Sequence, residues 1–173
     1  MPQAIEAKQF SGFIGRVLAE TTEPNAQPAL KEWVDAFADE TRENYTAERS
    51  PGGQPWSRWR FRPLDAPDDH PTLFISGALQ ASVTQPGSTG NINEVGSDSV
   101  TYGTNIPYAA SHQYGAQLRT ERSLVGRGGR GYIPAGTLVN IPARPFLGVT
   151  DSQANQAASM IARHIVSERI GKG

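Results

Sequence analysis

The sequence predicts an α+β fold in which a small antiparallel β-sheet is packed by an N-terminal amphipathic helix and a C-terminal helix, with long loops between them. Apolar residues recur at helical spacing near both ends of the 173-residue chain, and the middle alternates short β-prone segments with turn residues. The 18 Gly and 13 Pro are concentrated in that middle part. The length is that of one ordinary domain, so we expect a single domain over residues 1–173. Its expected parts are an N-terminal arm or helix (1–28), a helix (29–48), a β-rich region (73–147) with a loop (119–131), and a C-terminal helix (151–170).

Both long helices are predicted from periodicity together with start and stop signals. The first follows Pro28, which suits a helix start, and must end before the SPGGQP turn at 50–55. Its expected inner face consists of Leu30, Trp33, Val34, Phe37 and Tyr45. The second has Asp151 and Ser152 as N-cap candidates and Gly171 after its end. Its expected apolar face consists of Ala154, Ala157, Ala158, Ile161 and Ile165.

The segments between the helices are short. FISGALQASV at 74–83 predicts a helical turn leading into a strand, and INEV and SDSVTYGT predict two strands of an antiparallel meander. NIPYAASHQYGA predicts a short helix that Gly115 ends. The stretch 119–131 is rich in Arg and Gly and almost free of apolar residues, so we expect a long mobile loop there. The Pro-containing segment that follows suits a sheet edge or a subunit contact.

Composition excludes several classes of protein. The chain has no Cys, which removes disulfides, thiolate metal sites and cysteine nucleophiles. It has no apolar run long enough to span a membrane, and its start does not resemble a signal peptide, so we expect a soluble protein that folds in a cytoplasm.

Charge is distributed unevenly along the chain. The net charge is −1, but residues 1–48 hold nine acids and four bases, a net −5, and the rest carries +4. Of the 16 basic residues 13 are Arg. Such a chain could stack head to tail on copies of itself, and a merely uneven surface without function is the alternative.

The sequence gives little support for catalysis or for a cofactor. GRGGRG at 126–131 matches the spacing of a dinucleotide fingerprint but lacks the strand before it and the helix after it. The DDH sequence at 68–70 could hold a metal, although a solvated loop between two prolines is the better interpretation. His112 is better explained as a partly buried residue that anchors a short helix. We therefore expect no enzyme, no metal and no cofactor.

Two Arg-containing segments could contact nucleic acid. WSRWRFRP at 56–63 interleaves aromatic and basic residues, as single-strand binders do. The alternative, which we favour, is that Trp56 and Phe61 pack under the long helix and the Arg side chains face water. The Arg–Gly loop on a nearly neutral domain would give only a weak, salt-sensitive interaction.

Four segments in order resemble a known family. They are SPGGQPW at 50–56, FISGALQASV at 74–83, VTYGTNIPYAASHQYG at 100–115 and IPARPFLGVT at 141–150. Together they are similar to the phage virion morphogenesis, or tail completion, family of Mu-like tailed phages, over about residues 29–170.

The resemblance implies a structural virion protein of the head–tail junction, made in the host cytoplasm, that completes the tail or neck so that a filled capsid and a tail join. Its expected partners are copies of itself in a ring of six or twelve, other neck and tail proteins, and the packaged DNA in the channel, bound without sequence preference. It brings no catalytic residues, no cofactor and no membrane. A tail terminator or connector stopper ring, and a nucleic-acid-contacting module, are the alternatives.

The resemblance also implies roles for the motif residues. The residue types themselves further suggest which of them lie at a subunit interface and which face the DNA channel. The residues expected to shape the fold are Trp56, Tyr108, His112, Gly115 and Pro142. Those expected at the subunit interface are Arg144, Pro145, Phe146 and Leu147, because Arg and Phe are types common at interface hot spots. Those expected to face the lumen or DNA are Arg119, Arg122, Arg127 and Arg130.

Overall fold

The computed structural model describes residues 25–58, 71–125 and 132–170. The described helices are α2 (Gln27–Thr46), α3 (Ala78–Thr84), α4 (Ala109–Tyr114) and α5 (Asp151–Ile170). The described strands are β1 (Asn91–Val95), β2 (Val100–Thr104), β3 (Ala116–Arg119), β4 (Leu124–Val125), β5 (Tyr132–Ile133) and β6 (Leu138–Ile141). The predicted α+β class is confirmed. The expected single meander is replaced by three separate two-stranded antiparallel sheets, β1–β2, β3–β6 and β4–β5.

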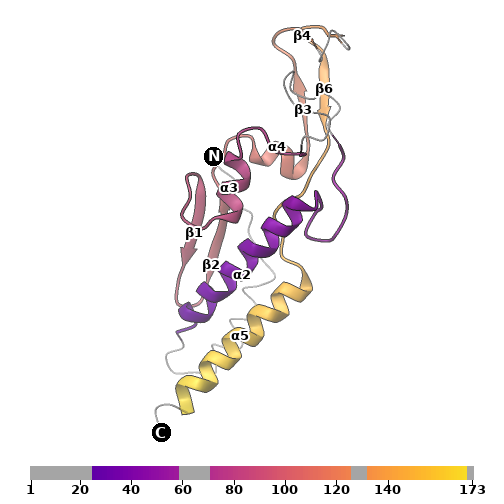
Figure 1. Cartoon of the computed structure of the whole chain (residues 1–173). Helices are drawn as coiled ribbons and strands as arrows, with labels where there is room; N and C mark the ends of the chain where they lie inside the picture. Colours follow the sequence, from indigo (N-terminus) through magenta and orange to yellow (C-terminus); the bar gives the residue numbers. More distant parts are fainter. Residues whose placement is uncertain (1–24, 59–70, 126–131, 171–173) are drawn as a thin grey trace.

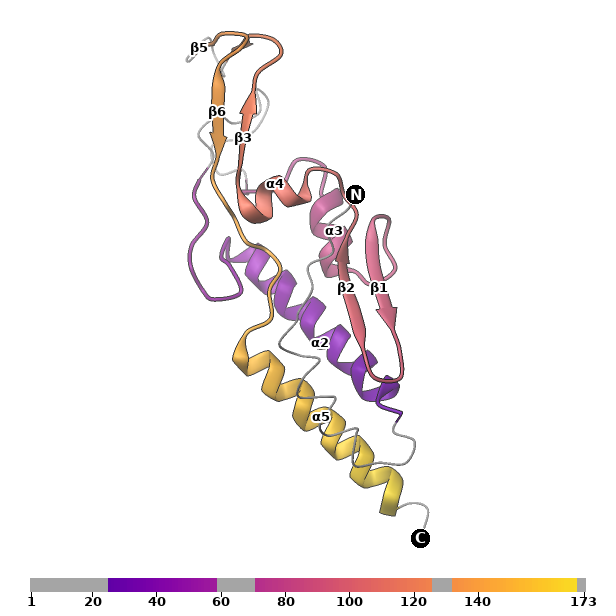
Figure 2. The same cartoon turned by 180° about the vertical axis from the view of Figure 1, so that it is seen from behind.

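Helix α2 is the centre of the body, with α5 along one side and the β1–β2 hairpin along the other (Figures 1 and 2). Its predicted apolar face is buried, with Leu30 fully inaccessible. Trp33 stacks on Phe37 at a ring distance of 5.2 Å, and Phe37 meets the edge of Tyr102 on β2. The helix begins two residues earlier than expected, with Pro28 in its first turn as predicted. The helix ends at Thr46, before the SPGGQP turn, and Glu48 between the two takes a left-handed conformation (φ 51°).

The start of α5 is fixed by a capping box. The Gln153 N–H donates to Thr150 Oγ1 (3.3 Å), and the Thr150 N–H donates back to Gln153 Oε1 (2.8 Å). The predicted caps Asp151 and Ser152 are therefore wrong by one or two residues, because both already lie inside the helix. Ala157 and Ile161 of the predicted apolar face are buried against α2, and the indole N–H of Trp33 donates to the Gln153 carbonyl.

The β1–β2 hairpin and α3 close the other side of the core. The two strands pair from Asn91↔Thr104 to Val95↔Val100, where sequence predicted them. The expected strand at the end of FISGALQASV is wrong, because this segment becomes α3, whose Leu79 and Val83 enter the core. The Tyr102 hydroxyl donates to the Val83 carbonyl, which joins the hairpin to this helix.

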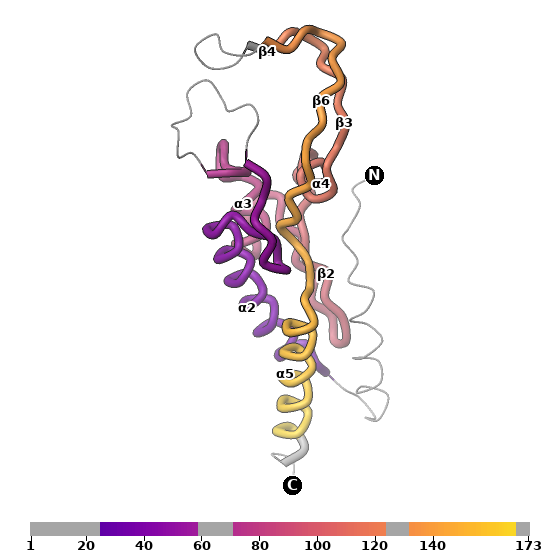
Figure 3. The backbone as a smooth tube through the Cα atoms, turned by 90° about the vertical axis from the view of Figure 1, so that its right-hand side faces the viewer, coloured from indigo at the N-terminus to yellow at the C-terminus, as the bar shows by residue number. Residues whose placement is uncertain are grey.

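A two-stranded arm projects from the body beyond α4 (Figures 1 and 3). β3 and β6 form its lower part, with Ala116 opposite Ile141 and Arg119 opposite Leu138. β4 and β5 form its upper part, and Figure 3 shows the arm bending between the two. The expected loop 119–131 is therefore wrong for residues 119 and 124–125, which lie in strands, and its remaining Gly-rich part, 126–131, is outside the described residues.

Candidate functional site

The PFLG segment before α5 is held in the core by one buried amide, that of Gln113 on α4. Its Nε2 donates to the Leu147 carbonyl (2.7 Å), and its Oε1 accepts from the N–H groups of Phe146 (3.0 Å) and Leu147 (3.1 Å). Three backbone groups that would otherwise lack partners in the core are thus satisfied by one side chain. The segment can then place Phe146, only 1% exposed, against Tyr45 of α2.

Gly115 ends α4, as the sequence predicted, and the arm begins directly after it. Its φ of +77° lies in the region that favours glycine. A Cβ at this position would lie 3.0 Å from the Ile141 carbonyl oxygen and 3.1 Å from the Ala143 nitrogen, both of them backbone atoms. Only glycine allows the two strands of the arm to approach this closely where they leave the body.

Arg144 lies inside the subunit. Its side chain is buried, and its guanidinium donates to the Ser57 carbonyl (2.6 Å) and the Arg58 carbonyl (3.2 Å). The backbone N–H of Arg144 donates to the His112 carbonyl. Burial lowers the pKa of Arg144, and the charge of Glu48 partly opposes that shift. The residue therefore joins three segments that are distant in sequence.

Trp56 also packs inside, under α2, as favoured from sequence. Its ring meets Tyr45 edge-on at 5.1 Å, and its indole N–H donates to the Pro145 carbonyl (2.9 Å). Phe61 and the neighbouring WRFR residues 59–62 lie outside the described residues, as does DDH at 68–70. Of the four residues expected at a subunit interface, Arg144, Phe146 and Leu147 are buried in the chain's own core and Pro145 is half-buried.

His112 and Tyr108 form the outer end of this cluster. Their rings meet edge-on at 6.1 Å, with Tyr108 exposed and His112 half-buried. The His112 Nδ1 is buried and has no hydrogen-bond partner among the described residues. Burial, reinforced by the charge of Arg144, lowers the pKa of His112, so the neutral ring is favoured.

The bend of the arm is held by Thr120 and Arg119. The Thr120 N–H donates to the Thr137 carbonyl, and the Thr120 carbonyl accepts from the Gly136 N–H. The Arg119 guanidinium donates to the Gly136 carbonyl (2.7 Å). Of the Arg residues expected to face a lumen or DNA, Arg119 and Arg122 are exposed on this arm, and Arg127 and Arg130 lie outside the described residues.

Large apolar side chains remain exposed on the arm. Leu118 is 49% exposed, Leu138 54% and Tyr132 65%. A two-stranded ribbon is marginally stable alone, and exposed apolar groups in such an element mark contact surfaces. The arm thus presents three large exposed apolar side chains within one short two-stranded element.

The sequence profile of the phage virion morphogenesis family matches residues 5–166. The chain belongs to the phage virion morphogenesis family. Membership confirms the resemblance found in the four motifs and gives the chain a role in the structure or assembly of a phage particle. No curated protein and no solved structure matches it.

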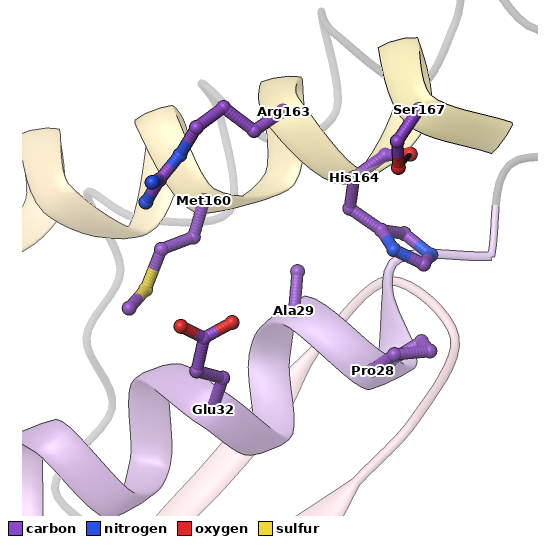
Figure 4. A pocket seen from close by; sticks show the side chains of 7 residues that line it. All are labelled: Pro28, Ala29, Glu32, Met160, Arg163, His164 and Ser167. Carbon is purple, nitrogen blue, oxygen red and sulfur yellow. Dashed lines mark hydrogen bonds between the residues drawn. The ribbon is translucent and has the colours of Figure 1, made fainter. Parts of the chain in front are cut away.

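In this family member, the described residues contain no group of three or more His, Asp or Glu side chains that could hold a metal. No helix of the described part is long and apolar enough to cross a membrane. A hollow of about 340 Å³ lies between the start of α2 and the second half of α5. Figure 4 shows its polar lining, Glu32 from one helix and Arg163, His164 and Ser167 from the other.

The motifs of this virion morphogenesis protein thus act mainly within the subunit. Trp56, Gly115, Arg144 and Phe146 fix the root of the arm to the body. Gln113 completes this set, although it is not among the residues predicted from the sequence. The only indication in the sequence is its place between His112 and Gly115 in the motif, at the buried side of a short helix.

Proposed function

We propose that the protein is a structural component of the phage head–tail junction, where it completes the tail and joins it to the filled capsid as part of a ring around the DNA channel. Family membership supports a particle-assembly role. The observation that carries the finer proposal is the arm: its root is joined to the body by the Gly115 turn and the Arg144 hydrogen bonds, and it projects from the body with exposed Leu118 and Leu138. A subunit of this shape is suited to contact a neighbouring subunit through the arm.

The motif residues act indirectly in this proposal. Arg144, Phe146 and Leu147 hold the arm's root, so their substitution would change the direction of the arm and would not remove a contact surface. The exposed parts of the arm, together with other exposed surfaces, make the contacts between subunits and with neighbouring neck or tail proteins. No catalytic step is part of the proposal.

Deleting the gene from the phage that encodes it tests this function. We expect filled capsids and separate tails to accumulate, visible by electron microscopy, and we expect the purified protein to restore joined particles when it is added to that extract. Normal infectious particles from the deletion would overturn the proposal. A gold label on the protein then separates the roles within the junction: a label on tails before joining indicates a tail-completing or terminator ring, and one on capsids indicates a connector stopper.

A further inference from the structure

The arm has one face made only of apolar side chains, and Leu118 on it is exposed. Residues opposite each other in an antiparallel pair point to the same side, so the pairs Ala116–Ile141 and Leu118–Val139 share one face. Gln117, Arg119, Leu138 and Asn140 share the other. The first face is entirely apolar, with Leu118 49% exposed and Ala116, Val139 and Ile141 half-buried. Figures 1–3 show that the strands β3 and β6 stand clear of α2 and α5.

The outer side of α2 has the complementary charge. Glu32, Asp35, Asp39 and Glu43 are all exposed and follow one another at intervals of three or four residues, which places them in one stripe along the helix. Glu32 borders the hollow beside α5, and Asp39 is paired with Arg42. Residues 27–46 hold five acids and two bases, a net −3. The described residues of the arm hold Arg119 and Arg122 against Glu121, a net +1.

Resting on the function proposed above, we propose that the arm of one subunit lies along the acidic outer side of α2 in a second copy of the chain. The arm points away from its own α2, as Figure 1 shows, and its root is held by the turn at Gly115 and by the Arg144 contacts. Leu118 and its neighbours are then covered, and Arg119 and Arg122 lie near carboxylates.

Apolar side chains next to the acceptor helix support this pairing. Phe74 and Ile75 are exposed just before α3. Two residues before Phe74, the Thr72 N–H donates to Glu48 Oε1, which places this segment beside the C-terminal end of α2. The acceptor surface thus offers apolar contacts as well as charge.

The contact joins two different surfaces, so each copy gives an arm to one neighbour and receives one from another. Such head-to-tail contacts close into rings when the rotation between copies allows it. DNA would also attract the Arg residues, but its phosphates offer nothing to an apolar strand face. A second copy of the chain satisfies both features.

Cysteine cross-linking tests the contact directly, because the natural chain has no Cys. Leu118→Cys is mixed with Glu32→Cys, Asp35→Cys, Asp39→Cys or Glu43→Cys, each in the full-length chain, and a bis-maleimide is added. The mixtures are made with purified protein and with particles complemented by both variants. We expect covalent heterodimers with at least one position of the stripe, and their loss when Leu118→Cys is mixed with Val166→Cys on the exposed side of α5.

Absence of heterodimers from every mixture, or homodimers of Leu118→Cys alone in the same amount, would overturn the proposal. A matched pair of variants provides the functional readout. Leu118→Asp should abolish assembly, whereas Gln117→Asp, on the opposite face of the same strand, should retain it, with circular dichroism showing that both are folded. Equal assembly by both, or loss of DNA binding in place of loss of subunit contact, would refute the arm contact while leaving the junction role to the deletion experiment.

Discussion

At the scale of single residues, Gln113 holds three backbone groups of the PFLG segment with one side chain. Gln113→Leu keeps a similar volume but leaves these groups unpartnered in the core. Each such group costs about 1–3 kcal/mol, so we expect the free energy of unfolding to fall by about 3 kcal/mol or more. Urea denaturation measures this change. Gln156→Leu on the exposed side of α5 should keep a free energy of unfolding within about 0.5 kcal/mol of the parent. Equal losses of stability in both variants would show that the Gln113 hydrogen bonds do not stabilise the PFLG segment.

His112 makes stability depend on pH. Its folded-state pKa lies below the ordinary 6.5, so the unfolded chain binds the proton first as pH falls. Stability should therefore decrease on acidification through about pH 6.5 and continue to decrease until the folded-state pKa is passed. We expect the drop in Tm between about pH 7.5 and pH 5.5 to be smaller in His112→Gln than in the parent. His164→Gln on α5 serves as the control, and a drop of the same size in all three proteins would exclude this role for His112.

The sequence motifs located much of this cluster but not what its members do. The positive φ and the close approach at Gly115 agree with a residue that ends a helix. Arg144 and Phe146 are residue types enriched at interfaces, but residue type does not distinguish an interface from a core. Gln113 was missed because its partners lie more than thirty residues further along the chain, and no local pattern shows that a polar side chain will be buried.

At the scale of elements, the capping box of α5 gives a clean test of helix-end chemistry. Thr150→Val keeps the side chain's shape and removes the hydroxyl that accepts from the Gln153 N–H. We expect a loss of about 1 kcal/mol, the usual cost of losing an N-cap, measured as a shift in the urea midpoint. Thr101→Val, exposed on β2, should change stability by less than about 0.5 kcal/mol. A Thr150 variant as stable as that control would show that the cap does not contribute.

Helices were more predictable than strands in this chain. The burial stripe of α2 repeats over twenty residues, so its periodicity alone identified it. The stretch from Arg119 to Val125 has almost no apolar pattern, yet the last residue of β3 and all of β4 lie there, because strand pairing uses backbone groups and the partners come from residues 132–141. The composition of a segment predicts how much apolar surface it can bury, but it does not predict whether another strand will pair with that segment.

At the scale of the whole molecule, body and arm should be separable. Of the buried apolar residues described, only Ile133 lies in the arm. Replacing residues 118–139 by Asn-Gly joins Gln117 to Asn140, which already face each other, by a favourable two-residue turn. We expect the shortened protein to fold with a Tm within about 4 °C of the parent but not to assemble. Loss of the near-ultraviolet circular dichroism signal in this variant would show that the arm is needed for the core.

The anchorage of the arm has a mechanical consequence. Its two strands leave the body at one end only, β3 through Gly115 and β6 through the backbone before Arg144. A pull on the tip therefore loads both strands along their length and passes into the body at two points a few ångströms apart. At one point the force meets α4, and at the other it meets the Arg144 contacts with Ser57 and Arg58. A load applied to the tip would therefore be carried by the buried Arg144 side chain and by the backbone at the half-buried Gly115.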